Sequence, residues 1–298
     1  MKIAILGASG NSGVLVVARL CEAGHQVTAI SRDPARLKGL DTRAKVTKGD
    51  LTDVAGMTGV LAAADRVISV AHAKFTGDLL AALPSDCAVV VTGSVRKYTG
   101  LVDPAADAVR AGEAAFLQWR ANGGTGVMVH PSMIYGAVGD RNVGRILGLI
   151  RRWPRIFPLV LPLPGGGKNT VQPVFADDFA DAVVAAATSS DPLPAMIDIV
   201  GPIAIPYSAM VRECARALGR RTFILPVPVG ALVVLAKIAG LVGIRLLFTA
   251  QEFARGVEDK RFDPAPMIKA LGVTPRSFAQ GVREKIAREG WPPLPGNP

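Results

Sequence analysis

Half of this chain of 298 residues is hydrophobic, which is enough for a compact, enzyme-sized protein of one or two lobes. Its 34 basic and 24 acidic residues give a formal charge of +10, which favours anionic ligands or surfaces, but the basic residues form no recognised nucleic-acid-binding motif. The three cysteines are widely separated and the three histidines lack metal-ligand spacing, so we expect a reducing compartment, no disulfide framework and no metal site.

The first predicted strand begins at residue 2, which leaves no room for a signal peptide, and we expect a cytoplasmic protein. This short apolar strand, Lys2–Leu6, runs into three glycines at G-x-x-G-x-x-G spacing. In such a turn the first glycine permits the tight reversal, the second lets a pyrophosphate approach the backbone, and the third allows the next helix to pack closely. The glycines and the residues between them are therefore predicted to bind a dinucleotide: Gly7, Ser9, Gly10, Asn11, Ser12 and Gly13.

An amphipathic helix is expected directly after this turn, over residues 14–23, with Gly24 as its C-cap. Its N-terminus would point free N–H groups and a partial positive charge at the phosphates of the ligand. The alternative is a glycine-rich turn that binds no ligand.

The second predicted strand, Gln26–Ser31, ends about 20 residues after the loop, where this type of fold tests the adenosine ribose. An acidic residue there would favour NAD by accepting a hydrogen bond from the 2′-hydroxyl. This chain has Arg32 instead, whose guanidinium can pair with a 2′-phosphate, so NADP is the preferred cofactor and NAD the second choice. Two alternatives remain: Asp33 lies at the ribose, or Arg32 is a solvated loop charge.

A third short strand, residues 44–48, leads into Gly49, Asp50 and Leu51. Asp50 is suitably placed to accept a hydrogen bond from the adenine amino group, and Leu51 is assigned to the cofactor site beside it. As a turn residue, Asp50 could equally be a helix N-cap.

Further apolar strands at 66–71, 88–93, 126–130 and 196–200 alternate with helices at 103–122 and 177–188. This alternation predicts an α/β protein with a doubly wound parallel sheet, a Rossmann fold over residues 1–200. Ligands of such sheets bind at the carboxyl ends of the strands, so Ala71, His130 and Pro131 are also assigned to the cofactor site.

Prolines and glycines near residue 200 mark the change to a smaller C-terminal substrate lobe, residues 201–298, with helices near 208–218 and 276–289. Residues 136–172 are expected to contribute to the substrate cleft. The apolar stretch 222–250 is broken by Pro226 and Pro228, which argues against a membrane span. We interpret it as a buried or interface helix; the alternative is peripheral membrane contact, helped by the basic charge.

Five segments carry a resemblance to a known superfamily: GASGNSG at 7–13, GDLTD at 49–53, TGSVRKY at 92–98, HPSMIYG at 130–136 and QPVFADD at 172–178. In this order they resemble the short-chain dehydrogenase/reductases, in the extended and atypical branches described as NAD-dependent epimerase/dehydratase-like or NAD(P)H-binding. The segment LGVTPRSF at 271–278 is most similar to the branch of complex I accessory-subunit-like proteins. The resemblance implies a nicotinamide cofactor and hydride transfer on a small molecule.

The chain departs from that superfamily at its usual Tyr-x-x-x-Lys pair. Tyr98, Tyr135 and Tyr207 are followed four residues later by valine, glycine and valine. A positioned acid or base contributes about 10² to 10⁴-fold in rate, so another group must substitute if the chain is a standard catalyst.

The best substitutes follow the fifth predicted strand. By resemblance, Ser94 would orient a carbonyl, and Tyr98 would donate the proton with Arg96 or Lys97 nearby to lower its pKa. Tyr135 and Gln172 are assigned to the substrate. The structural alternatives are a turn cap for Ser94, a loop anchor for Tyr98 and a satisfied buried imidazole for His130.

Two functions fit these residues. The first is an NADP-dependent oxidoreductase that transfers hydride on a small carbonyl, enone or sugar-like substrate. The second is a non-catalytic sensor or structural protein that binds NADP(H) and has a protein partner. Fold-level analogy supports both.

Overall fold

The computed structural model describes residues 1–37, 40–84, 86–228, 230–231 and 258–291. The chain divides into two compact units. Unit 1 comprises residues 1–132, 176–200 and 263–275, and unit 2 comprises residues 133–175, 201–262 and 276–298. The change near residue 200 is thus one of several places where the chain leaves a unit, and residues 133–175 belong with the C-terminal part.

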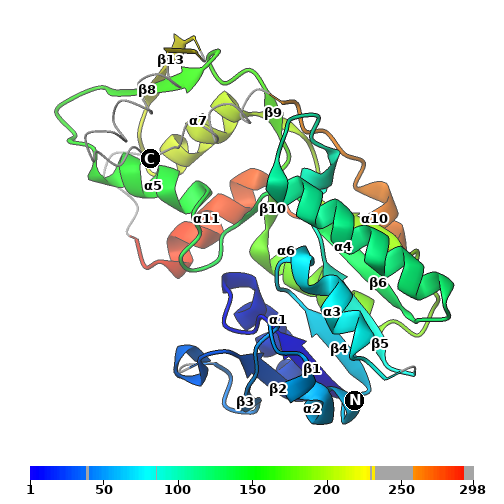
Figure 1. The fold of residues 1–298 in the computed structure, drawn as a ribbon. Coiled ribbons are helices and arrows are strands. Elements are labelled where there is room, and N and C mark those ends of the chain that lie inside the picture. Colours follow the sequence, from blue (N-terminus) through cyan, green and yellow to red (C-terminus); the bar gives the residue numbers. More distant parts are fainter. Residues whose placement is uncertain (38–39, 85, 229, 232–257, 292–298) are drawn as a thin grey trace. The chain divides into compact units, whose positions relative to one another are not determined.

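Unit 1 is built on a seven-stranded sheet in the order β11-β6-β5-β4-β1-β2-β3 (Figure 1). Every neighbouring pair is parallel, which confirms the predicted doubly wound α/β fold. The strands are β1 (Lys2–Leu6), β2 (Gln26–Ser31), β3 (Lys45–Lys48), β4 (Arg66–Ser69), β5 (Ala88–Thr92), β6 (Gly126–Pro131) and β11 (Met196–Ile199).

Helices cover both faces of this sheet. They are α1 (Asn11–Glu22), α2 (Thr58–Ala62), α3 (Thr76–Ala81), α4 (Pro104–Ala121), α6 (Ala176–Thr188) and α10 (Ala265–Leu271), with short 3₁₀ turns η1 (Pro34–Leu37), η2 (Ala55–Met57), η3 (Ala73–Phe75) and η4 (Val95–Tyr98). Val89 and Val91 of β5 pack with Leu79 of α3 and Phe116 of α4, because alternate residues of a strand share a face. α1 and α6 pack against each other, and the guanidinium of Arg19 binds Asp177 and Asp181.

Local capping signals explain where α4 begins and where α1 ends. Asp103 accepts a hydrogen bond from the N–H of Ala105 at 3.1 Å, and Pro104 follows as the first helical residue of α4. Gly24 adopts a φ of +78° just after α1, as its predicted capping role requires. The N-terminus of α1 differs slightly from the prediction, since the helix begins at Asn11 rather than at residue 14.

Unit 2 contains three small sheets and three helices among its described residues. The helices are α5 (Val143–Arg152), α7 (Tyr207–Ala217) and α11 (Phe278–Arg288). Parallel pairs join β7 (Ile134–Tyr135) to β10 (Val174–Phe175) and β8 (Leu159–Pro164) to β13 (Thr222–Val227), and β9 (Thr170–Val171) pairs antiparallel with β12 (Ile205–Pro206).

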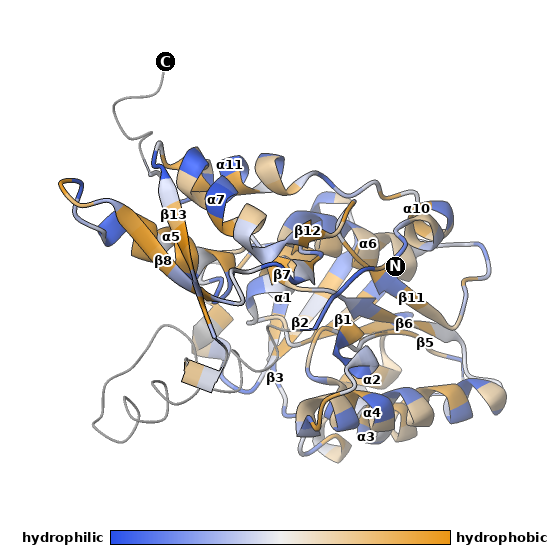
Figure 2. Ribbon diagram, turned by 90° about the horizontal axis from the view of Figure 1, so that it is seen from above, coloured by the Kyte–Doolittle hydropathy of each residue, from blue (hydrophilic) through white to orange (hydrophobic). Residues whose placement is uncertain are grey.

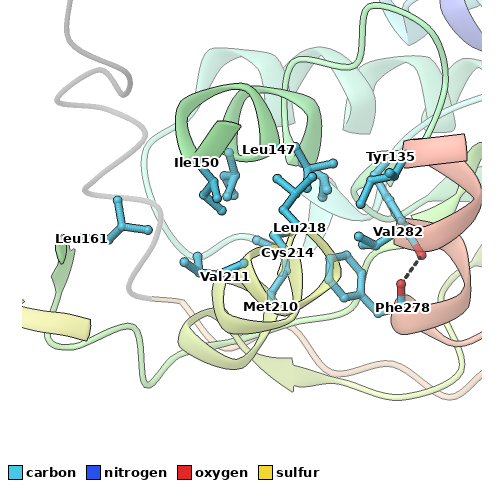
Figure 3. Packing of buried hydrophobic residues seen from close by; sticks show 14 of the residues in the cluster. Tyr135, Leu147, Ile150, Leu161, Met210, Val211, Cys214, Leu218, Phe278 and Val282 are labelled. Atoms are coloured by element: carbon cyan, nitrogen blue, oxygen red, sulfur yellow. Dashed lines mark hydrogen bonds between the residues drawn. The ribbon is translucent and has the colours of Figure 1, made fainter. Parts of the chain in front are cut away.

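One hydrophobic cluster holds these elements together. Leu147 and Ile150 of α5 lie near Met210 and Cys214 of α7, as Figure 3 shows together with Leu161 of β8. Each of these side chains is buried, and burying an aliphatic side chain contributes about 1.5 to 3 kcal/mol.

The apolar stretch 222–250 does not follow the helix interpretation at its start. Residues 222–227 form strand β13, whose regular pairing with β8 satisfies the backbone groups that a helix would otherwise pair internally. Residues 232–257 lie outside the described part of the chain.

Candidate functional site

The glycine loop lies at the carboxyl end of β1, between the strand and α1. Gly7 has a φ of +79°, a backbone conformation that residues with a side chain rarely adopt. Its carbonyl oxygen accepts a hydrogen bond from the N–H of Gly10 at 2.9 Å. A Cβ on Gly13 would overlap the carbonyl oxygen of Gly7, so only glycine lets α1 approach the loop this closely. Gly10 is the N-cap of α1 and has no side-chain cap, which leaves the N-terminal N–H groups for an anionic ligand.

The end of β2 places Arg32 at the expected ribose position. Ser31 Oγ donates to the carbonyl oxygen of Asp33 at 3.1 Å and lies 3.3 Å from Ser9 Oγ, which joins the end of β2 to the glycine loop. The Asp33 carboxylate accepts the N–H of Ala35 at 3.0 Å and caps η1. Arg32 and Asp33 are both exposed, and the Asp33 carboxylate is partly engaged in this local turn.

Asp50 also forms a local turn, at the carboxyl end of β3. Its Oδ1 accepts the N–H of Thr52 at 3.0 Å, and this bond lowers the pKa of the carboxyl below its ordinary value. The charge of Arg32 acts in the same direction, which shows that the two side chains belong to one electrostatic environment.

These segments enclose a cavity of about 830 Å³ in unit 1. Six of the predicted cofactor residues line it: Gly7, Ser9, Arg32, Asp50, Leu51 and Ala71. The glycine cradle, the uncapped helix N-terminus and the position at the carboxyl ends of β1, β2 and β4 fit a dinucleotide.

Other residues of this cavity were not predicted, including His72, Lys74 and Phe75 from the segment after β4. His72 Nδ1 accepts the N–H of Lys74 at 3.2 Å, so its ring is held as the cap of η3. Burial and the neighbouring Lys74 charge lower the pKa of His72, which favours a neutral ring. Their position in the sequence could have indicated this role, because polar residues that follow a parallel strand are candidates for ligand binding.

A second polar group lies at the carboxyl ends of β5 and β6. His130 is fully buried, and its Nδ1 accepts the N–H of Ser94 at 3.1 Å. Its Nε2 lies 3.2 Å from Glu113 Oε2 and 3.3 Å from Lys97 Nζ, and Lys97 is paired with Glu113 at 2.5 Å. Burial, with the Lys97 charge, lowers the pKa of His130 to about 3.

This arrangement supports the structural alternative for His130, because both ring nitrogens have protein partners and neither His130 nor Pro131 lines the cavity. Ser94 likewise fits its alternative as a turn cap, since its Oγ accepts the N–H of Arg96 at 3.1 Å. A hydroxyl can still donate its own hydrogen while accepting that bond.

Tyr98 contradicts the expectation of a lowered pKa. Its hydroxyl donates to Asp198 Oδ2 at 3.0 Å, and burial together with the Asp198 charge raises the pKa of the phenol to about 12. The two cations expected to lower that pKa pair with carboxylates: Arg96 with Asp103, and Lys97, whose Nζ also lies 4.9 Å from the centre of the Tyr98 ring, with Glu113. With its side chain anchored to β11, Tyr98 has the geometry of the loop anchor that was the alternative.

Arg110 of helix α4 does not replace the missing Tyr-x-x-x-Lys pair. That guanidinium donates to the carbonyl oxygens of Lys97 and Thr99 at 3.0 and 2.7 Å, and it also pairs with Asp107. Its role in the structure is to hold the turn η4 against α4.

The two predicted substrate residues are buried within unit 2. Tyr135 is fully buried, and its hydroxyl donates to the carbonyl oxygen of Phe278 at 3.3 Å (Figure 3). The Gln172 amide binds the backbone of Phe262 on both sides and donates to Gly201 O at 2.7 Å. Both side chains therefore have hydrogen-bond partners within unit 2.

Residues 7–111 match the protein-family model described as NAD(P)H-binding. The match spans the glycine loop and all of the cavity residues from Gly7 onward. This match agrees with the cofactor site predicted at the glycine loop. An uncharacterized protein of Saccharomyces cerevisiae, YLL056C, is 40% identical over 57 residues, but these residues are only 18% of this chain and 19% of the yeast protein.

Solved structures with the same fold cover nearly the whole chain. UDP-glucose 4-epimerase of Thermotoga maritima has a TM-score of 0.74 at 16% identity, covering 98% of this chain and 100% of its own. The NADPH-dependent quinone oxidoreductase QOR2 of Escherichia coli has a TM-score of 0.71 at 17% identity, covering 94% and 98%. UDP-glucuronic acid 4-epimerase of Bacillus cereus, in complex with NAD, has a TM-score of 0.71 at 17% identity, covering 96% and 98%.

The family match over residues 7–111 and the shared fold agree with the resemblance drawn from the sequence motifs. A nicotinamide cofactor is thereby supported, without a choice between its two forms. In the described part of the chain, no helix is long and apolar enough to cross a membrane, and no group of three metal-ligating side chains is found.

Proposed function

We propose that unit 1 binds NADP(H) and that the protein is an NADP(H)-dependent oxidoreductase of the atypical short-chain type. The proposal rests on Arg32, an exposed guanidinium that lines the cavity at the end of β2. A guanidinium binds a phosphate through charge-assisted hydrogen bonds, which a ribose without that phosphate cannot form. The engagement of Asp33 as the cap of η1 further weakens the case for NAD.

The remaining cavity residues have distinct roles in this proposal. The loop from Gly7 to Gly13 and the N-terminus of α1 would hold the pyrophosphate. Asp50 and Leu51 would lie beside the adenine, and Ala71 would lie along the ribose chain at the end of β4. When bound, the nicotinamide supplies or accepts a hydride, and the protein's part is to bind, orient and exclude water.

The substrates that this structure favours are those whose reduction does not require a tyrosine as proton donor. A phenol with a pKa of about 12 that donates to Asp198 is a poor acid near neutral pH, so we assign no proton transfer to Tyr98. Ser94 stays our candidate for orienting a small carbonyl, enone or sugar-like substrate. We propose it because its hydroxyl, while accepting the N–H of Arg96, can still donate its own hydrogen to a substrate.

The internal pairing at the ends of β5, β6 and β11 favours a second candidate function. A protein that binds NADP(H) as a sensor or structural cofactor needs the cavity but no proton donor. The Lys97–Glu113–His130 and Tyr98–Asp198 contacts would then serve only to stabilise the domain.

Calorimetric titration with NADPH and NADH, followed by single-turnover oxidation of bound NADPH against carbonyls and quinones, tests both candidates. We expect tighter binding of NADPH and oxidation by at least one acceptor. Binding without oxidation by any acceptor in the panel would favour the sensor, and no binding of either nucleotide would refute the proposal.

A further inference from the structure

The two-stranded ribbon of β8 and β13 in unit 2 has one apolar face in the core and another apolar face in solvent. Leu159, Leu161 and Leu163 of β8 are buried in the hydrophobic cluster of unit 2. The alternate residue Val160 is 36% exposed, and its partner across the ribbon, Phe223, is 64% exposed. Leu225, opposite Pro162, is 51% exposed.

A strand with one solvated face ordinarily alternates apolar and polar residues, because the outer positions contact water. Here the outer positions Val160, Pro162, Phe223 and Leu225 are all apolar, and β8 and β13 are both predominantly orange in the hydropathy colouring of Figure 2. We call these four residues the ribbon face. Contiguous exposed apolar surface of this kind marks an interaction site.

The loop before β8 adds two more exposed apolar side chains. Ile156 is 85% exposed and Phe157 is 58% exposed. The loop is fixed to the start of β13, because the guanidinium of Arg220 donates to the carbonyl oxygens of Trp153 and Pro154 at 3.1 and 3.4 Å. Thr222 Oγ1 donates to Leu159 O at 3.1 Å, so this loop and the ribbon form one continuous structure.

The charged residues of the two sequence segments that form this structure are basic, although Glu213, just before the second segment, pairs with Arg216. Residues 141–176 contain five arginines and one lysine but no aspartate or glutamate, and residues 214–228 contain three arginines and no carboxylate side chain. Arg152, Arg155 and Arg221 are exposed, beside the loop or at the start of β13. Arginine suits phosphate in particular, because its planar guanidinium binds two oxygens at once.

We propose that the ribbon face and the loop 152–157 dock on the surface of an anionic lipid bilayer. The apolar side chains would enter the boundary between headgroups and acyl chains, while the arginines bind the lipid phosphates. Charge complementarity selects this occupant, since apolar residues whose neighbouring charges are mainly arginines match a surface that is apolar inside and anionic outside. This inference is independent of the proposed cofactor chemistry.

The test is flotation of the full chain with two kinds of vesicle, phosphatidylcholine alone and phosphatidylcholine containing phosphatidylglycerol. We expect flotation with the anionic vesicles only. The double variant I156S/F157S removes apolar insertion, and R152Q/R155Q removes phosphate binding; each is expected to weaken the partition by roughly tenfold or more.

Two matched control variants distinguish binding through this face from nonspecific hydrophobic or electrostatic adsorption. V102S/I203S replaces two exposed apolar residues elsewhere, and K269Q/R283Q removes the same number of charges elsewhere. Both are expected to float as the unchanged protein does. Thermal denaturation of all variants shows whether each is folded, and all of the substituted side chains are exposed, so the melting temperatures should stay close together.

Three results would overturn the proposal. The first is absence of flotation with anionic vesicles. The second is equal weakening by K269Q/R283Q and R152Q/R155Q with no effect of I156S/F157S, which would mean adsorption through the net charge of +10. The third is a dimer in solution that I156S/F157S dissociates, since a second copy would then occupy the face.

Discussion

The two halves of the sheet in unit 1 use their polar residues in opposite ways. At the carboxyl ends of β2, β3 and β4, Arg32, Asp50 and Lys74 line a cavity. At the carboxyl ends of β5, β6 and β11, Lys97, Glu113 and His130 contact one another, and Tyr98 contacts Asp198. One half is thus arranged to receive a ligand, whereas the other is stabilised by its own side chains.

The superfamily resemblance implies both cofactor binding and acid–base chemistry, but the two halves of the sheet differ in which of these they support. Cofactor binding depends on backbone shape and on a few charges at the first half of the sheet, and these are present. Acid–base chemistry depends on a free titratable group in the second half, where burial and pairing shift the pKa values of His130 and Tyr98 away from neutral pH. Binding and turnover should therefore respond to different substitutions.

Gly10→Val is expected to have the largest effect and to act on the first half alone. A Cβ at this position would already lie 3.2 Å from Gly7 O, and the branched side chain would block the pyrophosphate. Affinity for both NADPH and NADH should fall by about 100-fold or more, measured by calorimetry. Gly148→Val is the control, because a Cβ there meets nothing within 4 Å; retained affinity of Gly10→Val would contradict the loop assignment.

Arg32→Ala sharpens the comparison within the cofactor half. It should weaken NADPH binding by about 1.5 to 3 kcal/mol, because a charge-assisted pair with the 2′-phosphate is lost, and leave NADH binding nearly unchanged. Lys45→Ala controls for a general loss of positive charge, since Lys45 is exposed on β3 and does not line the cavity. An equal loss for both nucleotides would remove the phosphate role.

In the second half of the sheet, the lowered pKa of His130 should make the free energy of unfolding depend on pH. The pKa of His130 is about 3 in the folded protein and 6.5 when unperturbed, so the unfolded chain binds the extra proton between these values. The free energy of unfolding should be highest above pH 6.5 and fall as the pH decreases, by at most about 1.4 kcal/mol per pH unit from this group.

His130→Gln removes the titrating group from the same position. Chemical denaturation between pH 6.5 and about 5, where few carboxyl groups titrate, should give a flatter curve for the variant by about 2 kcal/mol. Parallel curves for the two proteins would mean that His130 is not held neutral in the fold.

Tyr98→Phe should have the smallest effect. Tyr98 is 56% exposed, so loss of its bond to Asp198 should reduce the free energy of unfolding by about 1 kcal/mol or less. With an acceptor that oxidises bound NADPH, we expect the single-turnover rate to stay within about twofold, whereas Ser94→Ala slows it. A fall of about 10²-fold in Tyr98→Phe would restore this residue as the proton donor.

The sequence predicted the first half of the sheet well because its signals are local. The glycine spacing, the strand ending at Ser31 and the Asp103–Pro104 cap each lie within a few residues of the structure they determine. β8 gave no such signal, since Pro162 and Pro164 obscure a strand that forms only by pairing with β13, about 60 residues later.

The candidate catalytic residues could not be read in the same way. Lys97 meets Glu113 and His130 across separations of 16 and 33 residues, and Tyr98 meets Asp198 across 100 residues. Motif position placed Ser94 and Tyr98 after the correct strand, but a pKa depends on the partners that the fold brings near. For the same reason Tyr135 and Gln172 resembled site residues although their polar groups are bound within unit 2.

Residues 263–275 belong to unit 1, which matters for any attempt to isolate this unit. A fragment ending at residue 200 would keep all seven strands but lose α10, which contacts β11 and α6. β11 is an edge strand of the sheet, and an uncovered edge pairs readily with other chains. We expect such a fragment to aggregate unless α10 is joined back to it by a linker. Unit 1 is one compact body in space, but its residues are not continuous in the sequence.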